Sequence, residues 1–139
     1  MSVIVTDTGF GPDTFTGAYI PFEEASDVGA CQALDLQPTA EAAEVYPVLG
    51  EADLVRIAFP SSADGRGFSI ARGLRRLGYT GRLRAVGHVL ADQYAMARRA
   101  GFDEVEIDDA LAARQPEDQW VFRADWQAHD YRARLRLAG

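Results

Sequence analysis

The sequence predicts an α/β protein in which successive strand–helix units form a parallel sheet of about four strands. Apolar runs of strand length recur along the chain, an amphipathic helical stretch follows each of them, and glycines stand where helices should end. Consecutive βα units give parallel strands joined by right-handed crossovers. The spacing of these units suits half of a (βα)8 barrel as well as a small open sheet.

The elements follow from these patterns in chain order. We expect strands at residues 30–36, 54–59, 83–86 and 105–107, and helices at 38–49, 69–77, 90–100 and 109–114. In the second helix Ile70, Leu74 and Leu77 recur at helical spacing and Gly78 follows its end. Ser69 is expected to be the N-cap of that helix, and Asp108 or Asp109 the N-cap of the last one.

The chain of 139 residues suits a single domain with three parts. Residues 1–29 hold short apolar pieces between turn formers and are expected to form an irregular N-terminal arm or hairpin, residues 30–115 the βα core, and 116–139 an aromatic C-terminal tail. Exposed sheet edges tend to be covered or paired. We therefore expect the arm or the tail to cover one edge and a homodimer to be able to form at the other.

Charge and composition exclude several classes of function. A net charge of −7 argues against binding to nucleic acid, which needs a basic surface. The N-terminus has neither a basic region nor a long apolar stretch, so we expect a cytoplasmic protein that does not bind a membrane. Every basic residue is arginine. Schiff-base and P-loop lysines are therefore excluded, and arginine is the only cationic side chain that is always charged and able to bind an oxyanion.

Metal and cofactor sites are not indicated. Cys31 is the single cysteine and is expected to be a small buried side chain, while His88 and His129 lack zinc-binding spacing. Carboxylate-bound magnesium stays open as an alternative. We expect no resident cofactor or metal.

The stretch that follows the expected strand at 54–59 is the most informative part of the chain. Ligands of parallel α/β proteins bind beyond the carboxyl ends of the strands. The loops there are expected to bring a carboxylate, an imidazole and a guanidinium together, which suits general acid–base catalysis on an anionic substrate. The helix start adds free N–H groups that favour an oxyanion. The candidate anion-binding residues are Asp64, Gly65, Arg66, Gly67, Ser69, Arg84, His88 and Asp92, and Ser61, Ser62, Asp108 and Asp109 point toward the same edge.

Each of these residues also has a simpler structural interpretation. Asp64 fits a hydrogen bond to its own turn, Ser69 an N-cap, and His88 a cap of the third helix. Arg84 alternates with apolar residues in a central strand, so it should be partly buried and ion-paired with Asp64 or Asp92. An anion site at Arg66 requires that another arginine neutralise Asp64.

The run from Ala63 to Asp108 resembles a bacterial family of unknown function. The matching motifs are Asp64-Gly65-Arg66-Gly67, Gly78-Tyr79, Leu83-Arg84-Ala85, Asp92-Gln93 and Gly101-Phe102-Asp103. Members are encoded beside assimilatory sulfite reductase and are often labelled a probable oxidoreductase in sulfite reduction. Many carry an acid at the position of His88, and the family has no established catalytic residue. The chain itself has no GxGxxG fingerprint, no CxxC pair and no cluster-ligand set, so a redox role is not supported by its residues.

Three functions follow as expectations. The first is an accessory protein of assimilatory sulfite reduction that binds the reductase, its electron donor, or a small oxyanion such as sulfite, sulfate or phosphate. The second is a small enzyme that uses Asp64 and Arg66 on an anionic substrate, and the third is a scaffold without a ligand. An enzyme should enclose these residues in a pocket, a binding protein should present them as an exposed patch, and a scaffold should pair them internally.

Overall fold

An open sheet of seven strands organises the computed structural model, which describes residues 2–25, 28–29 and 32–124. The strand order is β2-β1-β7-β6-β5-β4-β3. The strands from β3 to β7 are mutually parallel, and β1 runs antiparallel to both β7 and β2. The bounds are β1 (Ser2–Thr6), β2 (Gly9–Gly11), β3 (Ala18–Pro21), β4 (Gln32–Leu36), β5 (Leu54–Phe59), β6 (Arg82–Gly87) and β7 (Glu104–Asp108).

The four predicted core strands are confirmed as β4 to β7, which follow one another in the sheet. The prediction of about four strands is wrong for the whole sheet, because the N-terminal segment supplies three more strands. This segment covers both edges: β1 and β2 extend the sheet beyond β7, and β3 extends it beyond β4. The outermost strands are short, and β3 ends at Pro21, which blunts the edge for further pairing. The edges of the four core strands, which motivated the homodimer, are therefore paired within the chain, and the edges of the described sheet are β2 and β3.

The helices differ from the prediction mainly at their starts. They are α1 (Ala42–Val45), α2 (Arg66–Leu77), α3 (Tyr94–Ala100), α4 (Asp109–Arg114) and α5 (Glu117–Phe122), with 3-10 turns at Phe22–Glu24, Tyr46–Val48 and Ala91–Gln93. The first helix is shorter than expected, and α2 begins three residues earlier than Ser69. Gly78 ends α2 in the left-handed conformation, as predicted, and the Asp108 side chain caps α4 by accepting from the Leu111 N–H at 2.8 Å.

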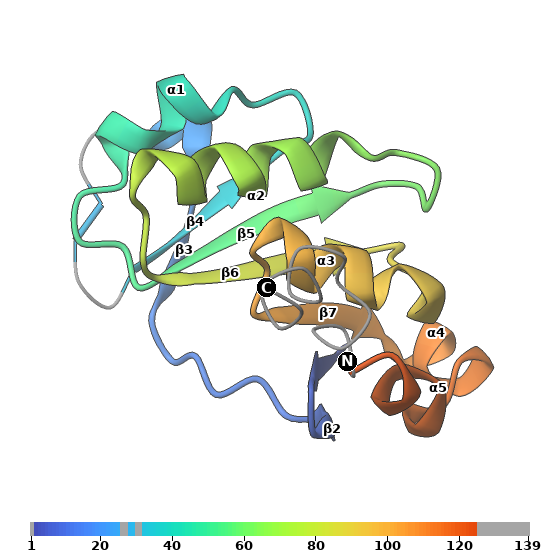
Figure 1. The fold of residues 1–139 in the computed structure, drawn as a ribbon. Helices are drawn as coiled ribbons and strands as arrows, with labels where there is room; N and C mark the ends of the chain where they lie inside the picture. Colours follow the sequence, from blue (N-terminus) through green and yellow to red (C-terminus); the bar gives the residue numbers. More distant parts are fainter. Residues whose placement is uncertain (1, 26–27, 30–31, 125–139) are drawn as a thin grey trace, which may run out of the picture.

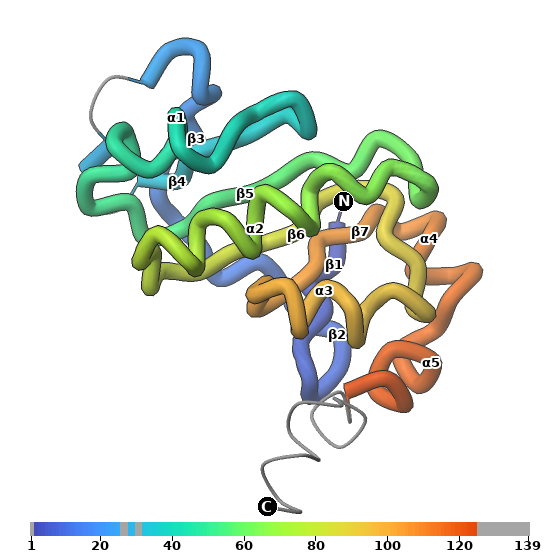
Figure 2. Tube along the Cα trace, turned by 45° about the horizontal axis from the view of Figure 1, so that its top comes forward, coloured from blue at the N-terminus to red at the C-terminus, as the bar shows by residue number. Residues whose placement is uncertain are grey.

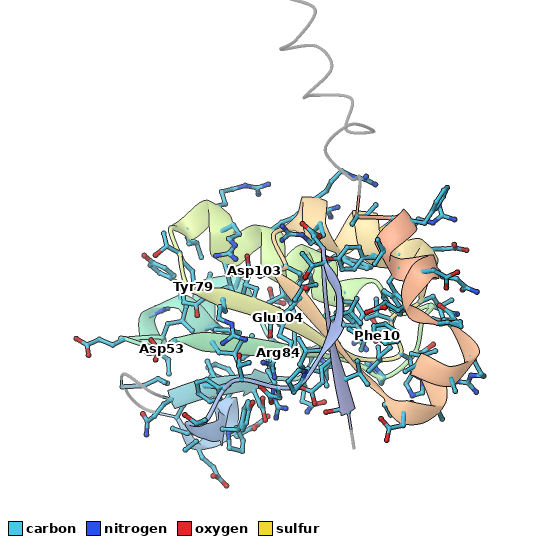
Figure 3. All side chains as sticks on the ribbon, turned by 90° about the horizontal axis from the view of Figure 1, so that it is seen from below. Phe10, Asp53, Tyr79, Arg84, Asp103 and Glu104 are labelled. Atoms are coloured by element: carbon cyan, nitrogen blue, oxygen red, sulfur yellow. The ribbon has the colours of Figure 1, made fainter. Side chains whose placement is uncertain are left out.

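The two faces of the sheet are covered differently. Helices α1, α2 and α3 lie on one face (Figure 1), where the Phe59, Phe68 and Phe102 rings pack together in the core. In the described part of the chain the opposite face carries no helix, and the N-terminal segment between β2 and β3 crosses it (Figure 3). We call this surface the helix-free face. Parallel sheets usually have both faces covered, so it is an unusual feature of the fold.

The first part of the predicted tail is helical and packed. Trp120 of α5 is fully buried, its ring lies edge-on to that of Tyr94, and its indole N–H donates to the Gln115 carbonyl. Glu117 accepts a hydrogen bond from the backbone N–H of Phe10 in β2, which joins the two ends of the chain. Trp126, the segment up to Leu137, and Cys31 lie outside the described residues.

No described helix combines the length and the apolar character that crossing a lipid bilayer requires.

Candidate functional site

The candidate site begins at the connection between β5 and α2, at the carboxyl end of the sheet. Arg66 and Asp64 form a two-pronged ion pair there: Nε donates to Oδ1 at 2.9 Å and Nη2 to Oδ2 at 2.7 Å. The Arg66 backbone N–H also donates to Oδ1, at 3.2 Å. These hydrogen bonds lower the pKa of Asp64. The condition for an anion site at Arg66 is not met, because the arginine that should hold the anion itself neutralises Asp64.

The two glycines of this connection differ in how closely their neighbours approach them. Neither Gly65 nor Gly67 has a positive φ, so conformational freedom does not explain them. Gly67 is needed for close approach, because a Cβ there would lie 2.5 Å from the Phe59 ring. Gly65 is the N-cap of α2, and a Cβ there would meet nothing closer than 3.9 Å. Gly67 therefore lets the first turn of α2 pack directly on β5.

Ser69 lies inside α2 and is exposed, so its predicted role as N-cap is wrong. It borders a cavity of about 440 Å³ between α2 and the loop that precedes α1, together with Arg66 and Thr39. Arg66 and Ser69, two of the predicted anion-binding residues, thus line the same cavity as the hydroxyl group of Thr39.

The remaining residues of the carboxyl edge are also exposed. Asp92 is 81% exposed and pairs with Arg123 at 2.8 Å, a contact between the turn before α3 and the end of α5. The His88 backbone N–H donates to the Phe59 carbonyl, while its exposed side chain borders a cavity of about 160 Å³ beside Glu106 and Arg114. Ser62 and Asp108 have structural roles, since the Ser62 carbonyl accepts from the Gln93 side chain and Asp108 caps α4. We call Asp64, Arg66, His88, Asp92 and Arg123 the carboxyl rim.

Arg84 is not part of the carboxyl rim. It lies in the middle of β6 on the helix-free face, and its side chain is fully buried. The prediction that it is buried and ion-paired is confirmed, but the predicted partners Asp64 and Asp92 are wrong. Its guanidinium donates to Glu104 at 2.7 Å, to Glu106 at 2.9 Å and to Asp13 at 3.0 Å. The reason is register: Arg84 lies directly opposite Glu104 in β7, on the same side of the sheet.

The Arg84 contacts belong to a larger network that the sequence did not reveal. Arg56 of β5 pairs with Asp35 at 2.6 Å and donates to Glu106 at 3.3 Å, and the Tyr19 ring stacks over its guanidinium. Charged residues alternate with apolar ones in β5, β6 and β7, which could have identified a shared polar face. The members of this network are Asp13, Tyr19, Asp35, Arg56, Arg82, Arg84, Glu104 and Glu106.

The network is fully engaged with itself. Among the described residues, no buried side-chain nitrogen or oxygen lacks a hydrogen-bond partner. Burial lowers the pKa of Arg84, but the surrounding carboxylates outweigh it and raise the pKa overall. Figure 3 shows Arg84 and Glu104 side by side beneath the N-terminal segment. The network therefore fastens that segment to the sheet, and each of its three arginines is paired with a carboxylate inside it.

The fold and the rim together define a one-sided α/β protein with an exposed, charge-balanced edge. Residues 33–135 match the family described as bacterial protein of unknown function (DUF934), and the chain belongs to this family. The resemblance seen in the sequence is thereby confirmed. No curated protein and no solved structure matches the chain.

Proposed function

We propose that this protein is an accessory protein of assimilatory sulfite reduction that acts by binding the reductase or its electron donor. The observation that carries the proposal is the exposure of the carboxyl rim. Arg66 is 58% exposed and Asp92 81% exposed, and each belongs to an ion pair on the surface. This is the arrangement expected of a docking patch, since an enzyme of anionic substrates would hold such groups in an enclosed pocket. The link to sulfite reduction rests on the family resemblance.

The test is calorimetric titration of the full chain with purified sulfite reductase and, separately, with its electron donor. We expect binding to one of them. The Asp64→Asn/Arg66→Gln double variant keeps the net charge and should bind at least about tenfold more weakly, because it removes a charged pair at the contact. Glu44→Gln, which neutralises an exposed carboxylate of α1 outside the rim, should bind like the wild type. Absence of binding to either protein would overturn the proposal.

A second candidate function is binding of a small sulfur oxyanion. The cavity of about 440 Å³ favours it, because Arg66, Ser69 and Thr39 line the same hollow near the start of α2, which Glu41 also borders. Binding there requires Arg66 to exchange Asp64 for the anion. Titration with sulfite and with sulfate tests this candidate: heat of binding that is lost in both Arg66→Ala and Ser69→Ala would support it, and no heat at millimolar anion would exclude it.

A further inference from the structure

The outer surface of α2 and α3 carries arginines that have no partner among the residues that the structure describes. Most described arginines are held by carboxylates or carbonyls, as Arg75 is by the Gly101 carbonyl and Asp103. By contrast, Arg72 and Arg76 of α2 and Arg99 of α3 are exposed and make no hydrogen bond or ion pair within residues 2–25, 28–29 and 32–124. Three unmatched cations on neighbouring helices are unexpected in a chain with a net charge of −7.

Helix geometry places these arginines on one surface. In α2 the buried positions are Ile70, Ala71 and Leu74, so Arg72 and Arg76, four residues apart, lie on the opposite side of the helix. In α3 the buried positions are Tyr94, Ala97 and Ala100, which turns Arg99 outward. The two helices are neighbours on the same face of the sheet (Figure 2), and the Arg75 side chain joins the end of α2 to the C-cap of α3.

An exposed apolar side chain accompanies the arginines. Met96 of α3 is 42% exposed although methionine is usually buried. Arginine and methionine are both enriched at protein–protein interfaces, where arginine supplies directional hydrogen bonds and methionine an adaptable apolar contact. The sequence of α2 contains no acidic residue that could neutralise its outer surface. We call Arg72, Arg76, Met96 and Arg99 the basic helix patch.

We infer that the basic helix patch docks an acidic surface of a protein partner, in addition to the contact at the carboxyl rim. Charge complementarity argues for this occupant, because the patch is locally positive while the chain as a whole is negative. A protein partner can present a local acidic patch, whose attraction is felt within about 8 Å at physiological salt. A long nucleic acid would meet the repulsion of the whole acidic chain. The identity of the natural partner rests on the proposed function, whereas the charge preference of the patch does not.

The experiment uses two titrations of the full isotopically labelled chain followed by NMR. The first probe is a synthetic decapeptide of glutamate with one central leucine, and the second is a single-stranded DNA long enough to extend from the patch over the acidic remainder of the surface. We expect peptide-induced shifts on α2 and α3, weaker binding at higher salt, and little response to DNA. The Arg72→Gln/Arg76→Gln/Arg99→Gln triple variant should bind the peptide roughly 30-fold more weakly, because each exposed arginine contributes about threefold.

The matched control compares two single variants in their affinity for the peptide. Arg76→Gln removes an arginine of the patch and should weaken binding about threefold, whereas Arg114→Gln removes an arginine outside it. Arg114 of α4 is likewise exposed and without a hydrogen bond or ion pair in the described part of the chain, but it lies outside the patch. Arg114→Gln should therefore change the affinity for the peptide less than twofold. Unchanged peptide binding in the triple variant, or tighter binding of DNA than of peptide, would overturn the inference.

The same triple variant, titrated with sulfite reductase and its electron donor, separates the two proposals. If the wild type binds neither protein, the proposed function fails while the peptide result still decides the patch. If the wild type binds one of them and the triple variant binds it equally well, the role of the patch fails and the proposed function stands.

Discussion

Arg84 and Asp13 join the centre of the sheet to the segment that crosses its helix-free face. Nη2 and Nη1 of Arg84 donate to Oδ1 and Oδ2 of Asp13 at 3.0 and 3.2 Å, although 71 residues separate the two in sequence. The Arg84 side chain is fully buried, whereas that of Asp13 is 29% exposed. The N-terminal segment is therefore fastened by a charge at the middle of its path as well as by the strands at its two ends.

Replacing Arg84 by alanine should destabilise the protein by about 3–5 kcal/mol, because the buried Glu104 and the partly buried Glu106 would lose the cation that they share. Glu104 would keep only Arg82, which is partly exposed, and Glu106 only the longer contact with Arg56. Urea unfolding measures the difference. The control is Arg82→Ala, since the side chain of Arg82 is 37% exposed and its pair with Glu104 should contribute at most about 1 kcal/mol. A loss below about 1 kcal/mol for Arg84→Ala would contradict the structural role of the network.

The Asp13 carboxylate should make stability depend on pH. Burial raises its pKa, but hydrogen bonds from Arg84, the Phe15 N–H and Tyr19 outweigh burial and lower the pKa from 3.8 to about 2. A pKa lowered in the folded state gives stability that is present above about pH 4 and is lost as the pH falls through about 2. The gain is at most about 2 kcal/mol, since the side chain is partly solvated.

Urea unfolding of the wild type and Asp13→Asn between pH 7 and pH 2 measures this dependence. The difference in unfolding free energy should be largest at neutral pH and should shrink below pH 4. A wild-type advantage that stays constant down to pH 2 would disprove the assignment to Asp13.

Gly67→Ala should destabilise the protein by about 1–3 kcal/mol, because the added methyl group would collide with the Phe59 ring. Gly65→Ala, two residues earlier, is the control and should have a much smaller effect, as its nearest neighbour lies 3.9 Å away. Thermal unfolding followed by circular dichroism compares the pair. Equal effects of the two substitutions would mean that close approach does not explain Gly67.

Arg75 should be far more important for stability than Arg76, its neighbour in α2. Arg75 donates to the carbonyls of Tyr79, Gly81 and Gly101 and to Asp103, whereas Arg76 is exposed and has no partner among the described residues. Arg75→Ala should cost about 2–3 kcal/mol, because hydrogen bonds to a charged group are lost. Arg76→Ala should stay within about 0.5 kcal/mol, and similar losses for both would refute this reading.

The sequence predicts the core of the fold because local pattern determines it. The apolar run from Leu54 to Phe59 and the glycine after Leu77 identify β5 and the end of α2 without tertiary information. The local pattern also predicted a hairpin or arm at residues 1–29, and β1 and β2 form such a hairpin. It could not predict that these strands join the sheet, since β1 pairs with β7, which lies about a hundred residues further along the chain. Short strands of this kind form because a neighbouring strand is available, which a local pattern does not report.

The carboxyl rim could be predicted only in part, because the sequence gives the position of a residue after a strand but not the partner of its side chain. Position after a strand correctly placed Asp64, Arg66, His88 and Asp92 at one edge, whereas pairing between side chains depends on register. Arg84 illustrates this: its alternation with apolar residues predicted a buried cation, but only the alignment of β6 with β7 shows that Glu104 lies opposite. The choice between a docking patch and a pocket likewise required the exposure of Arg66, which the sequence does not determine.

Growth on sulfite is the measurement that tests the central claim most directly. A bacterial strain that lacks the gene should grow poorly with sulfite as its sole sulfur source and normally with cysteine, which bypasses sulfite reduction. The wild-type gene should restore growth on sulfite, and the Asp64→Asn/Arg66→Gln variant, produced at the same level, should restore it only weakly. Equal growth of the deletion strain and the wild type on sulfite would contradict a role for this protein in assimilatory sulfite reduction.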